Sequence, residues 1–204
     1  MKIDVKEKIK NYFKTKKWWS IALDFLFYLL ILLVLIPSTR RTVWPVLMRT
    51  VLHPPLKKVS TAPIRTLGER DLQWSLATLD GRHVTLGDYR GRVLFINLWA
   101  TWCPPCRAEM PGIEKLYKDY GDRVAFLMIA GDSPEKVRTY IEDNGYTFPV
   151  LIQETKAPPP LQTSSIPTTF IVDRQGNIVL QHKGASKWNA GKIRKLLDEL
   201  LQEN

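Results

Sequence analysis

The feature that most constrains the fold is a pair of cysteines, Cys103 and Cys106, standing between a predicted strand and a predicted helix. The preceding run 93–100 (VLFINLWA) is almost entirely apolar, which is typical of a central strand buried on both faces. From Pro104 to about Tyr120 the apolar residues have helical spacing. The sequence therefore predicts a buried strand that leads through Cys-Pro-Pro-Cys directly into a helix.

The position of Cys103 at the start of this helix favours a reactive thiolate. Unpaired backbone N–H groups and the helix dipole stabilise an anion there. Such a position typically lowers a thiol pKa from about 8.5 into the range of about 3.5–7.5. Because the thiolate is the nucleophile, we predict that Cys103 attacks a disulfide. Cys106, one helical turn further on, is then expected to resolve the mixed disulfide.

Three other interpretations of the pair are weaker. A purely structural disulfide across so short a loop removes only about 2 kcal/mol of unfolded-chain entropy. A zinc site needs four ligands as a rule, and His53, His83 and His182 stand at no useful spacing. Idle buried thiols would not need two prolines and a helix start. We therefore predict a redox disulfide with no metal ion and no cofactor.

The patterns on either side of this junction predict an α/β fold. Trp74–Asp80 and Val84–Leu86 flank an Asp80-Gly81 turn, which predicts a β-hairpin. The other expected elements are a strand at 124–130, a helix at 134–144, a strand at 148–152, a hairpin at 168–172 and 178–181, and a helix at 187–201. This order of strands and helices predicts an α/β sandwich around a mixed sheet.

Residues 18–36 form an apolar run of 19 residues with one charge, Asp24. As a helix the run is about 28 Å long, close to the roughly 30 Å hydrocarbon core of a bilayer. Trp18 and Trp19 stand at one end, where aromatic belts occur. No small-x-small cleavage pattern follows, so we predict an uncleaved transmembrane signal anchor rather than a cleaved signal peptide. Asp24 is expected near the headgroups or against a partner helix.

Half of the net charge of +10 lies in residues 1–17, which hold seven lysines and two acids. A basic arm beside an apolar run is a topology signal and a contact for anionic lipid. No nucleic-acid-binding motif accompanies it, so we predict no nucleic-acid partner. We expect the N-terminus in the cytoplasm and everything after Ile36 outside. Five prolines make residues 37–66 a predicted stalk, and residues 67–204 are expected to form one domain.

The stretch WATWCPPCRAEMP (99–111) resembles the active-site signature of the TlpA/ResA branch of thioredoxin-like proteins. The resemblance extends over roughly residues 67–187 and includes LDGRHVTLGDYRGRVLFINLWA before the site and IPTTFIVDRQGNIV (166–179) after it. It implies a thioredoxin-like fold with an N-terminal β-hairpin and an inserted βαβ unit. It also implies a single-pass protein of the bacterial inner membrane. Its periplasmic domain would act on protein disulfides and receive electrons from a membrane dithiol carrier.

The resemblance also assigns expected roles to individual residues. Pro167 matches the proline that is cis in this fold and faces the cysteine pair, so that the backbone beside Cys103 can pair with a substrate strand. Glu109 matches an acid that several members keep close to the pair, whereas Asn97 stands where many thioredoxins have a buried acid. Glu109 is thus the expected proton acceptor, the alternative being an exposed acid that favours the helix dipole. The expected substrate-binding residues are Trp102, Pro104, Ile166 and Pro167.

The chain departs from the family between Ile152 and Ile166, where relatives commonly have a short helix. The sequence Lys156-Ala-Pro-Pro-Pro160 favours polyproline geometry instead. The leading hypothesis is a reductase or isomerase of disulfides in exported proteins. One alternative is a copper-handling protein that uses the two soft thiolates. The other is a peroxiredoxin-like peroxidase, although no further resolving cysteine is present.

Overall fold

The computed structural model describes residues 18–35 and 63–203. The predicted basic arm at 1–17 and most of the predicted stalk, residues 37–62, lie outside the described residues. The chain divides into two compact units, Met1–Val46 and Leu47–Asn204.

The first unit contains one described helix, α2 (Trp18–Leu35). Trp18, Phe25 and Tyr28 are among its exposed large side chains. Within the described ranges, no helix combines the length and the apolarity that crossing a bilayer requires.

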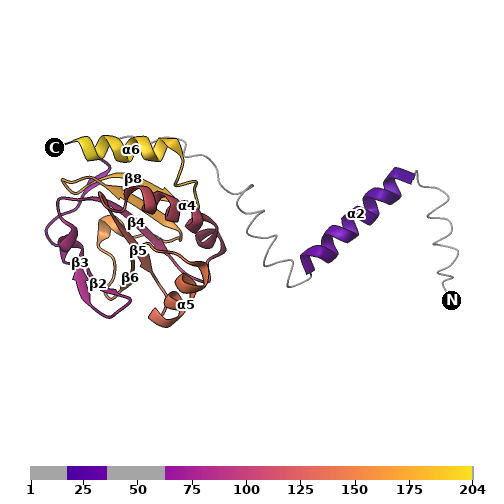
Figure 1. Cartoon of the computed structure of the whole chain (residues 1–204), viewed down its shortest axis with the longest axis horizontal. Coiled ribbons are helices and arrows are strands. Elements are labelled where there is room, and N and C mark those ends of the chain that lie inside the picture. Colours follow the sequence, from indigo (N-terminus) through magenta and orange to yellow (C-terminus); the bar gives the residue numbers. More distant parts are fainter. Residues whose placement is uncertain (1–17, 36–62, 204) are drawn as a thin grey trace. The chain divides into compact units, whose positions relative to one another are not determined.

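The second unit is built on a mixed sheet of eight strands in the order β1-β8-β7-β4-β5-β6-β2-β3 (Figure 1). Strand β4 lies near the middle, parallel to β5 and antiparallel to β7, and all its side chains are buried. The strands are β1 (Arg65–Thr66), β2 (Ser75–Thr78), β3 (His83–Thr85), β4 (Val93–Trp99), β5 (Val124–Ala130), β6 (Val150–Gln153), β7 (Thr168–Val172) and β8 (Asn177–Lys183). The helices are α4 (Pro104–Tyr120), α5 (Pro134–Asn144) and α6 (Gly191–Gln202).

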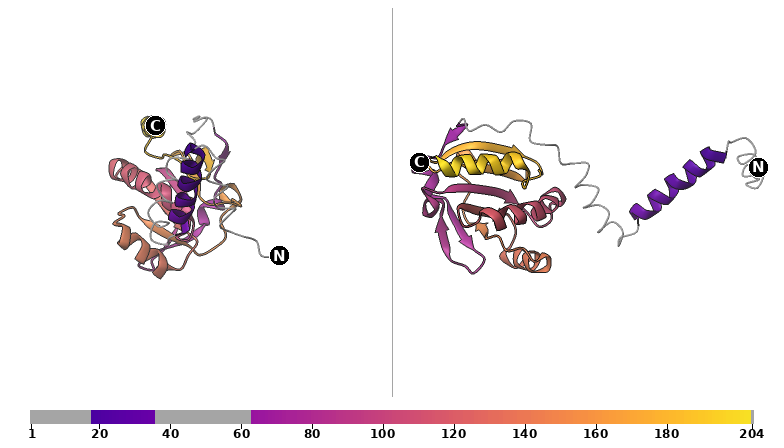
Figure 2. Two further views of the ribbon diagram at one scale, coloured as in Figure 1. Left: turned by 90° about the vertical axis from the view of Figure 1, so that its right-hand side faces the viewer. Right: turned by 45° about the horizontal axis from the view of Figure 1, so that its top comes forward.

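The two faces of the sheet are covered differently. On one face, Phe95 of β4 packs in a hydrophobic cluster with buried residues of α4, α5 and α6. Helices α4 and α6 lie side by side (Figure 2). The Tyr120 hydroxyl of α4 donates to Asp198 of α6 over 3.0 Å. On the other face, Ile96 packs with residues from short 3-10 turns, η1 (Asp71–Gln73), η2 (Leu86–Tyr89) and η3 (Pro159–Leu161). Both the predicted mixed sheet and its N-terminal hairpin, β2 with β3, are therefore present.

Local signals place the helices that flank the site. Cys103 is the N-cap of α4, and Pro104 and Pro105 occupy its first turn, where a missing N–H costs nothing. Helix α5 likewise begins with Pro134 after Ser133. Gly145, the residue that follows its last residue, has a φ of 63°, which favours glycine. The predicted bounds of α4 and α5 agree with the structure.

Helix α6 begins at Gly191, four residues later than the prediction of Lys187. Trp188 lies in the loop before it and is fully buried, which holds this segment in an irregular course against α4. The hydrogen bond from the Ile193 amide to the Ala190 carbonyl, 3.0 Å long, marks the turn into the helix. The prediction was wrong here because the burial of Trp188 is a tertiary effect.

The edge strand β1 and the three 3-10 turns were not predicted. Arg65 and Thr66 form the edge strand β1, which pairs with Ile178 and Asn177 of β8 although it lies within the segment predicted as stalk. Both residues are exposed, so they carry no alternating apolar signal. In place of the expected polyproline geometry, Pro159–Leu161 form η3, where the Leu161 amide donates to the Pro158 carbonyl over 2.9 Å. The burial of Leu161 favours this turn, and the prolines occupy positions that need no N–H donor.

Glu114 of α4 forms hydrogen bonds with the segment that precedes β6. Its buried carboxylate accepts the Thr147 amide at 2.9 Å and the Thr147 hydroxyl at 2.7 Å, and Lys118 lies 3.3 Å away. Burial alone would raise the pKa of Glu114, but the hydrogen bonds from Thr147 and Lys118 outweigh it, so the pKa is lowered.

We expect Glu114→Gln to lower the free energy of unfolding at pH 7 by about 1–2 kcal/mol. A lowered pKa in the folded state stabilises the protein above the unfolded-state pKa of about 4.3, and this contribution is lost as the pH falls. The wild type should therefore lose stability more steeply than the variant below about pH 4.3 in denaturant titrations. Glu199→Gln, at an exposed carboxylate 3.7 Å from Lys195, is the control and should change little. Identical pH dependence in wild type and Glu114→Gln would contradict this account.

Candidate active site

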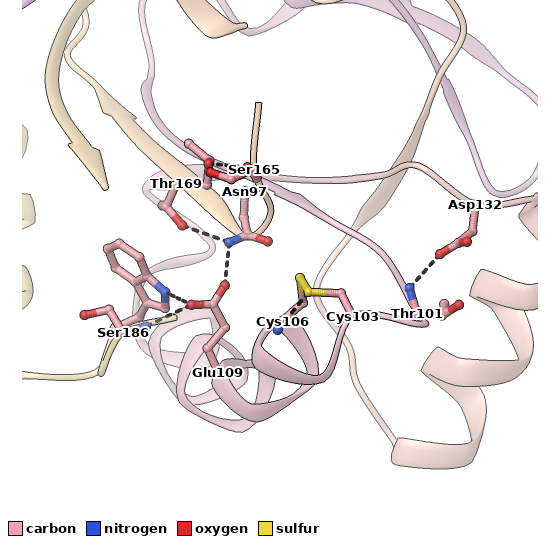
Figure 3. The surroundings of a disulfide bond; sticks show 11 residues. Asn97, Thr101, Cys103, Cys106, Glu109, Asp132, Ser165, Thr169 and Ser186 are labelled. Carbon is pink, nitrogen blue, oxygen red and sulfur yellow. Dashed lines mark hydrogen bonds between the residues drawn. A yellow bond between two sulfur atoms is a disulfide. The ribbon is translucent and has the colours of Figure 1, made fainter. Parts of the chain in front are cut away.

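The site is built on the turn that joins β4 to α4 (Figure 3). Cys103 and Cys106 form a disulfide with a Cα–Cα separation of 5.3 Å. The Cys106 amide donates to the Cys103 Sγ atom over 3.3 Å, so the sulfur of Cys103 occupies the N-cap position of the helix. This position can stabilise negative charge on Cys103 once the disulfide is reduced.

The cysteine turn is fixed by a hydrogen bond to the segment after β5, and part of it is exposed to solvent. The Thr101 amide donates to the Asp132 carboxylate over 2.6 Å, which ties the turn to the residues after β5. Trp102 is 69% exposed and Pro104 is exposed, while both cysteines are buried. Trp102 is therefore a large apolar side chain that faces solvent next to the disulfide.

Pro167 lies at the same end of the sheet. The Ile166–Pro167 peptide bond is cis, as the resemblance implies. The next residue, Thr168, is the first of β7 and pairs with Leu98 near the end of β4. Because Cys103 follows β4 closely in the chain, this pairing places the proline segment at the end of β4 where the cysteine turn begins. Ile166 is half-buried there, and Pro167 is buried.

Glu109 lies one turn beyond Cys106 and is 1% exposed, so the interpretation as an exposed helix-capping acid is wrong. Its Oε1 atom accepts the Asn97 Nδ2 group at 2.8 Å. Its Oε2 atom accepts the Trp188 indole N–H at 2.7 Å and the Ser186 amide at 3.1 Å. Three donors from two segments, β4 and the loop between β8 and α6, therefore converge on one buried carboxyl group (Figure 3).

The proton affinity of Glu109 reflects two opposing effects. Burial raises the pKa of Glu109 from 4.5 to about 7, and hydrogen bonds from Trp188, Asn97 and Ser186 oppose this rise. A carboxyl group with this pKa exchanges a proton near neutral pH. It can therefore accept or return a proton beside the cysteine pair.

Asn97 connects this carboxyl group to the sheet. The residue is fully buried on β4, and its Nδ2 group also donates to the Thr169 hydroxyl of β7 over 2.8 Å. Asn97 stands at the position where many thioredoxins have a buried acid, and here it donates a hydrogen bond to Glu109.

The partners Trp188 and Ser186 were missed in the sequence. Trp188 stood inside the predicted C-terminal helix, although Asn189 and Gly191 directly after it are residues that disfavour a helix start so early. A second signal was the lone tryptophan among small and polar residues. In the described parts of the chain, no three His, Cys, Asp or Glu side chains gather closely enough to hold a metal ion.

The folded unit is similar to several known proteins. A model of the AhpC/TSA family matches residues 67–181. The thioredoxin-like protein YneN of Bacillus subtilis strain 168 is 40% identical over 121 residues, which are 57% of this chain and 71% of that protein. The thiol-disulfide oxidoreductase ResA of Halalkalibacterium halodurans is 30% identical over 138 residues, 66% of this chain and 75% of that protein. The crystal structure of the exposed lipoprotein thioredoxin Etrx1 of Streptococcus pneumoniae has a TM-score of 0.53 at 27% identity, covering 62% of this chain and 98% of that chain.

The raised pKa of Glu109 predicts a specific pH dependence of stability. Between about pH 4.3, the pKa of glutamate in an unfolded chain, and about pH 7, the folded protein binds a proton that the unfolded chain does not. This residue should therefore lower the free energy of unfolding by about 3 kcal/mol as the pH rises through that window. Denaturant titrations of the disulfide-bonded protein should show this loss in the wild type and not in Glu109→Gln. Parallel curves for the two proteins would contradict the assignment.

Proposed function

This chain belongs to the AhpC/TSA family and, by its thioredoxin-like fold and its relatives, to the thiol–disulfide oxidoreductases, and from that premise we propose that it reduces or isomerises disulfide bonds in exported proteins. The observation that carries the proposal is the disulfide between Cys103 and Cys106 at the N-terminus of α4. There the helix favours a thiolate on the first cysteine of the reduced pair.

The exchange proceeds in two steps. The Cys103 thiolate attacks one sulfur of a substrate disulfide, forming a mixed disulfide and releasing the other substrate sulfur as a thiol. The Cys106 thiolate then attacks Cys103, which forms the Cys103–Cys106 disulfide and releases the second substrate thiol. The substrate gains two electrons and two protons, and the cysteine pair loses them.

Glu109 is the proposed proton acceptor for the second step. Cys106 is fully buried, and burial disfavours its thiolate. A carboxylate one helical turn away, with its pKa raised by burial to about 7, can take the proton and still be ionised in part near neutral pH.

Substrate binding is proposed for the surface around the cysteine turn. Trp102 and Pro104 are exposed beside Cys103, and Ile166 and Pro167 precede β7 at the same sheet edge. The exposed indole provides apolar contact area, and the backbone at the cis-proline can pair with an extended substrate segment.

The two cysteines are expected to behave differently when one is replaced. Cys106→Ser should accumulate mixed disulfides with an oxidised substrate such as insulin, because Cys103 still attacks and no second thiol releases the product. Cys103→Ser should accumulate few. Non-reducing gels and mass spectrometry measure both, and circular dichroism verifies folding.

Equal trapping by the two variants would refute the assignment of roles. Anaerobic Cu(I) titration and peroxide turnover of the wild type distinguish disulfide exchange from the copper-handling and peroxidase alternatives.

The proposed place of action is the outer face of a bacterial inner membrane. The proposal rests on the whole apolar run at 18–36 and on the seven lysines that precede it. Positive charge stays on the cytoplasmic side, which would leave residues 37–66 as a tether and the redox domain outside. Anionic lipid would contact the basic arm, and a membrane dithiol carrier would reduce the Cys103–Cys106 disulfide after each turnover.

A fusion after Asn204 tests this topology. We expect a reporter that is active only outside the cytoplasm to be active there and to fractionate with membranes. The same fusion lacking residues 1–36 is the control and should be inactive. Activity of a cytoplasm-specific reporter, or release of the full-length fusion in soluble form, would contradict the anchor.

A further inference from the structure

Trp188 is a fully buried residue in the loop between β8 and α6. Its ring packs edge-on against Phe95 of β4 at 5.4 Å and against His182 of β8 at 5.6 Å. Its indole N–H makes the shortest of the three hydrogen bonds to Glu109, at 2.7 Å. The residue therefore connects the hydrophobic cluster under the helices to the buried carboxyl group of Glu109.

The loop that carries Trp188 is fixed at several points. The Gly184 amide donates to the Pro167 carbonyl over 2.8 Å, and the φ of Gly184 is +94°, which favours glycine. The Ser186 amide then donates to Glu109. The loop thus joins the cis-proline segment to the carboxyl group. The packing of the Trp188 ring against Phe95 and His182 fixes the orientation of its indole N–H.

We propose that Trp188 is a positioning residue of the redox site, which orients the Glu109 carboxylate and keeps it available to accept the proton of Cys106. This inference rests on the proposed function, where Glu109 is the acceptor. An N–H donor stabilises the ionised form of a buried carboxyl group and does little for its neutral form. Loss of the indole N–H should therefore leave Glu109 protonated at pH values where the wild type is ionised.

Other charged groups near Glu109 are common to all variants compared. Lys115 and Lys187 are exposed and line a groove of about 370 Å³ that Glu109 also borders. His182 faces Trp188, and burial lowers the pKa of His182, which keeps its ring neutral near pH 7. The cysteine pair is uncharged while it is oxidised. A titration of the oxidised protein therefore isolates the contribution of the indole.

Trp188→Phe keeps an aromatic ring and removes the N–H group. In the oxidised protein we expect the carboxyl titration of Glu109, followed by carbon-13 NMR of labelled glutamate, to move upward by about one pH unit. This corresponds to a roughly tenfold smaller ionised fraction below the midpoint. The pH profile for release of a preformed mixed disulfide should move upward by a similar amount. Glu109→Gln identifies the signal.

Trp74→Phe is the matched control. Trp74 is also buried, and its indole N–H donates over 3.0 Å to the Thr155 carbonyl, within the cluster on the other face of the sheet. Its replacement should lower stability without moving the Glu109 titration. If Trp188→Phe does not fold, benzothienylalanine at position 188 preserves the ring shape and still lacks the N–H group.

An unchanged Glu109 titration after loss of the indole N–H, or the same shift in Trp74→Phe, would overturn the role of Trp188. The role of Glu109 is decided separately by the release rate in Glu109→Gln. A titration shift in Trp188→Phe with a wild-type release profile in Glu109→Gln would support the orientation of the carboxylate by Trp188. It would reject Glu109 as the acceptor in the proposed function.

Discussion

The structure depends on the burial of β4 between two strands and two hydrophobic layers. Every residue from Val93 to Trp99 is buried and hydrogen-bonded within the sheet, so the end of this strand is a fixed point. Helix α4 starts five residues after β4 ends, and its first turn contains two prolines that need no N–H partner. The rigid strand therefore determines where the helix N-terminus lies. Cys103 is the residue placed there.

A second constraint is the carboxyl group of Glu109, which the helix carries into the core. A buried carboxylate is costly, and three hydrogen bonds offset only part of that cost, since the pKa is still raised to about 7. A fully compensated carboxylate would have an ordinary or lowered pKa, as Glu114 does on the same helix. The incomplete compensation at Glu109 destabilises the fold at neutral pH and gives the site a group that exchanges protons there.

The sequence predicted the elements whose signals are local. Strands β4 and β5 and helices α4 and α5 follow from apolar runs, prolines at helix starts and a glycine at a helix end. The edge strand β1 and the late start of α6 were not predictable in this way. The first depends on pairing with β8, and the second depends on the burial of Trp188 against Phe95. At the site, the cysteines were evident from their spacing, whereas the donors to Glu109 come from positions up to 79 residues away.

The three donors to Glu109 differ in how substitution can change them. The Ser186 donor is a backbone amide, which stays in place whatever side chain the residue carries. Asn97 also donates to Thr169, so its replacement would disturb the pairing region of β4 and β7 as well as the carboxyl group. The Trp188 indole N–H has Glu109 as its partner, and its ring occupies a space that another aromatic residue can fill in large part. Position 188 is therefore where the proton affinity of this site can change with the least disturbance to the cysteine turn.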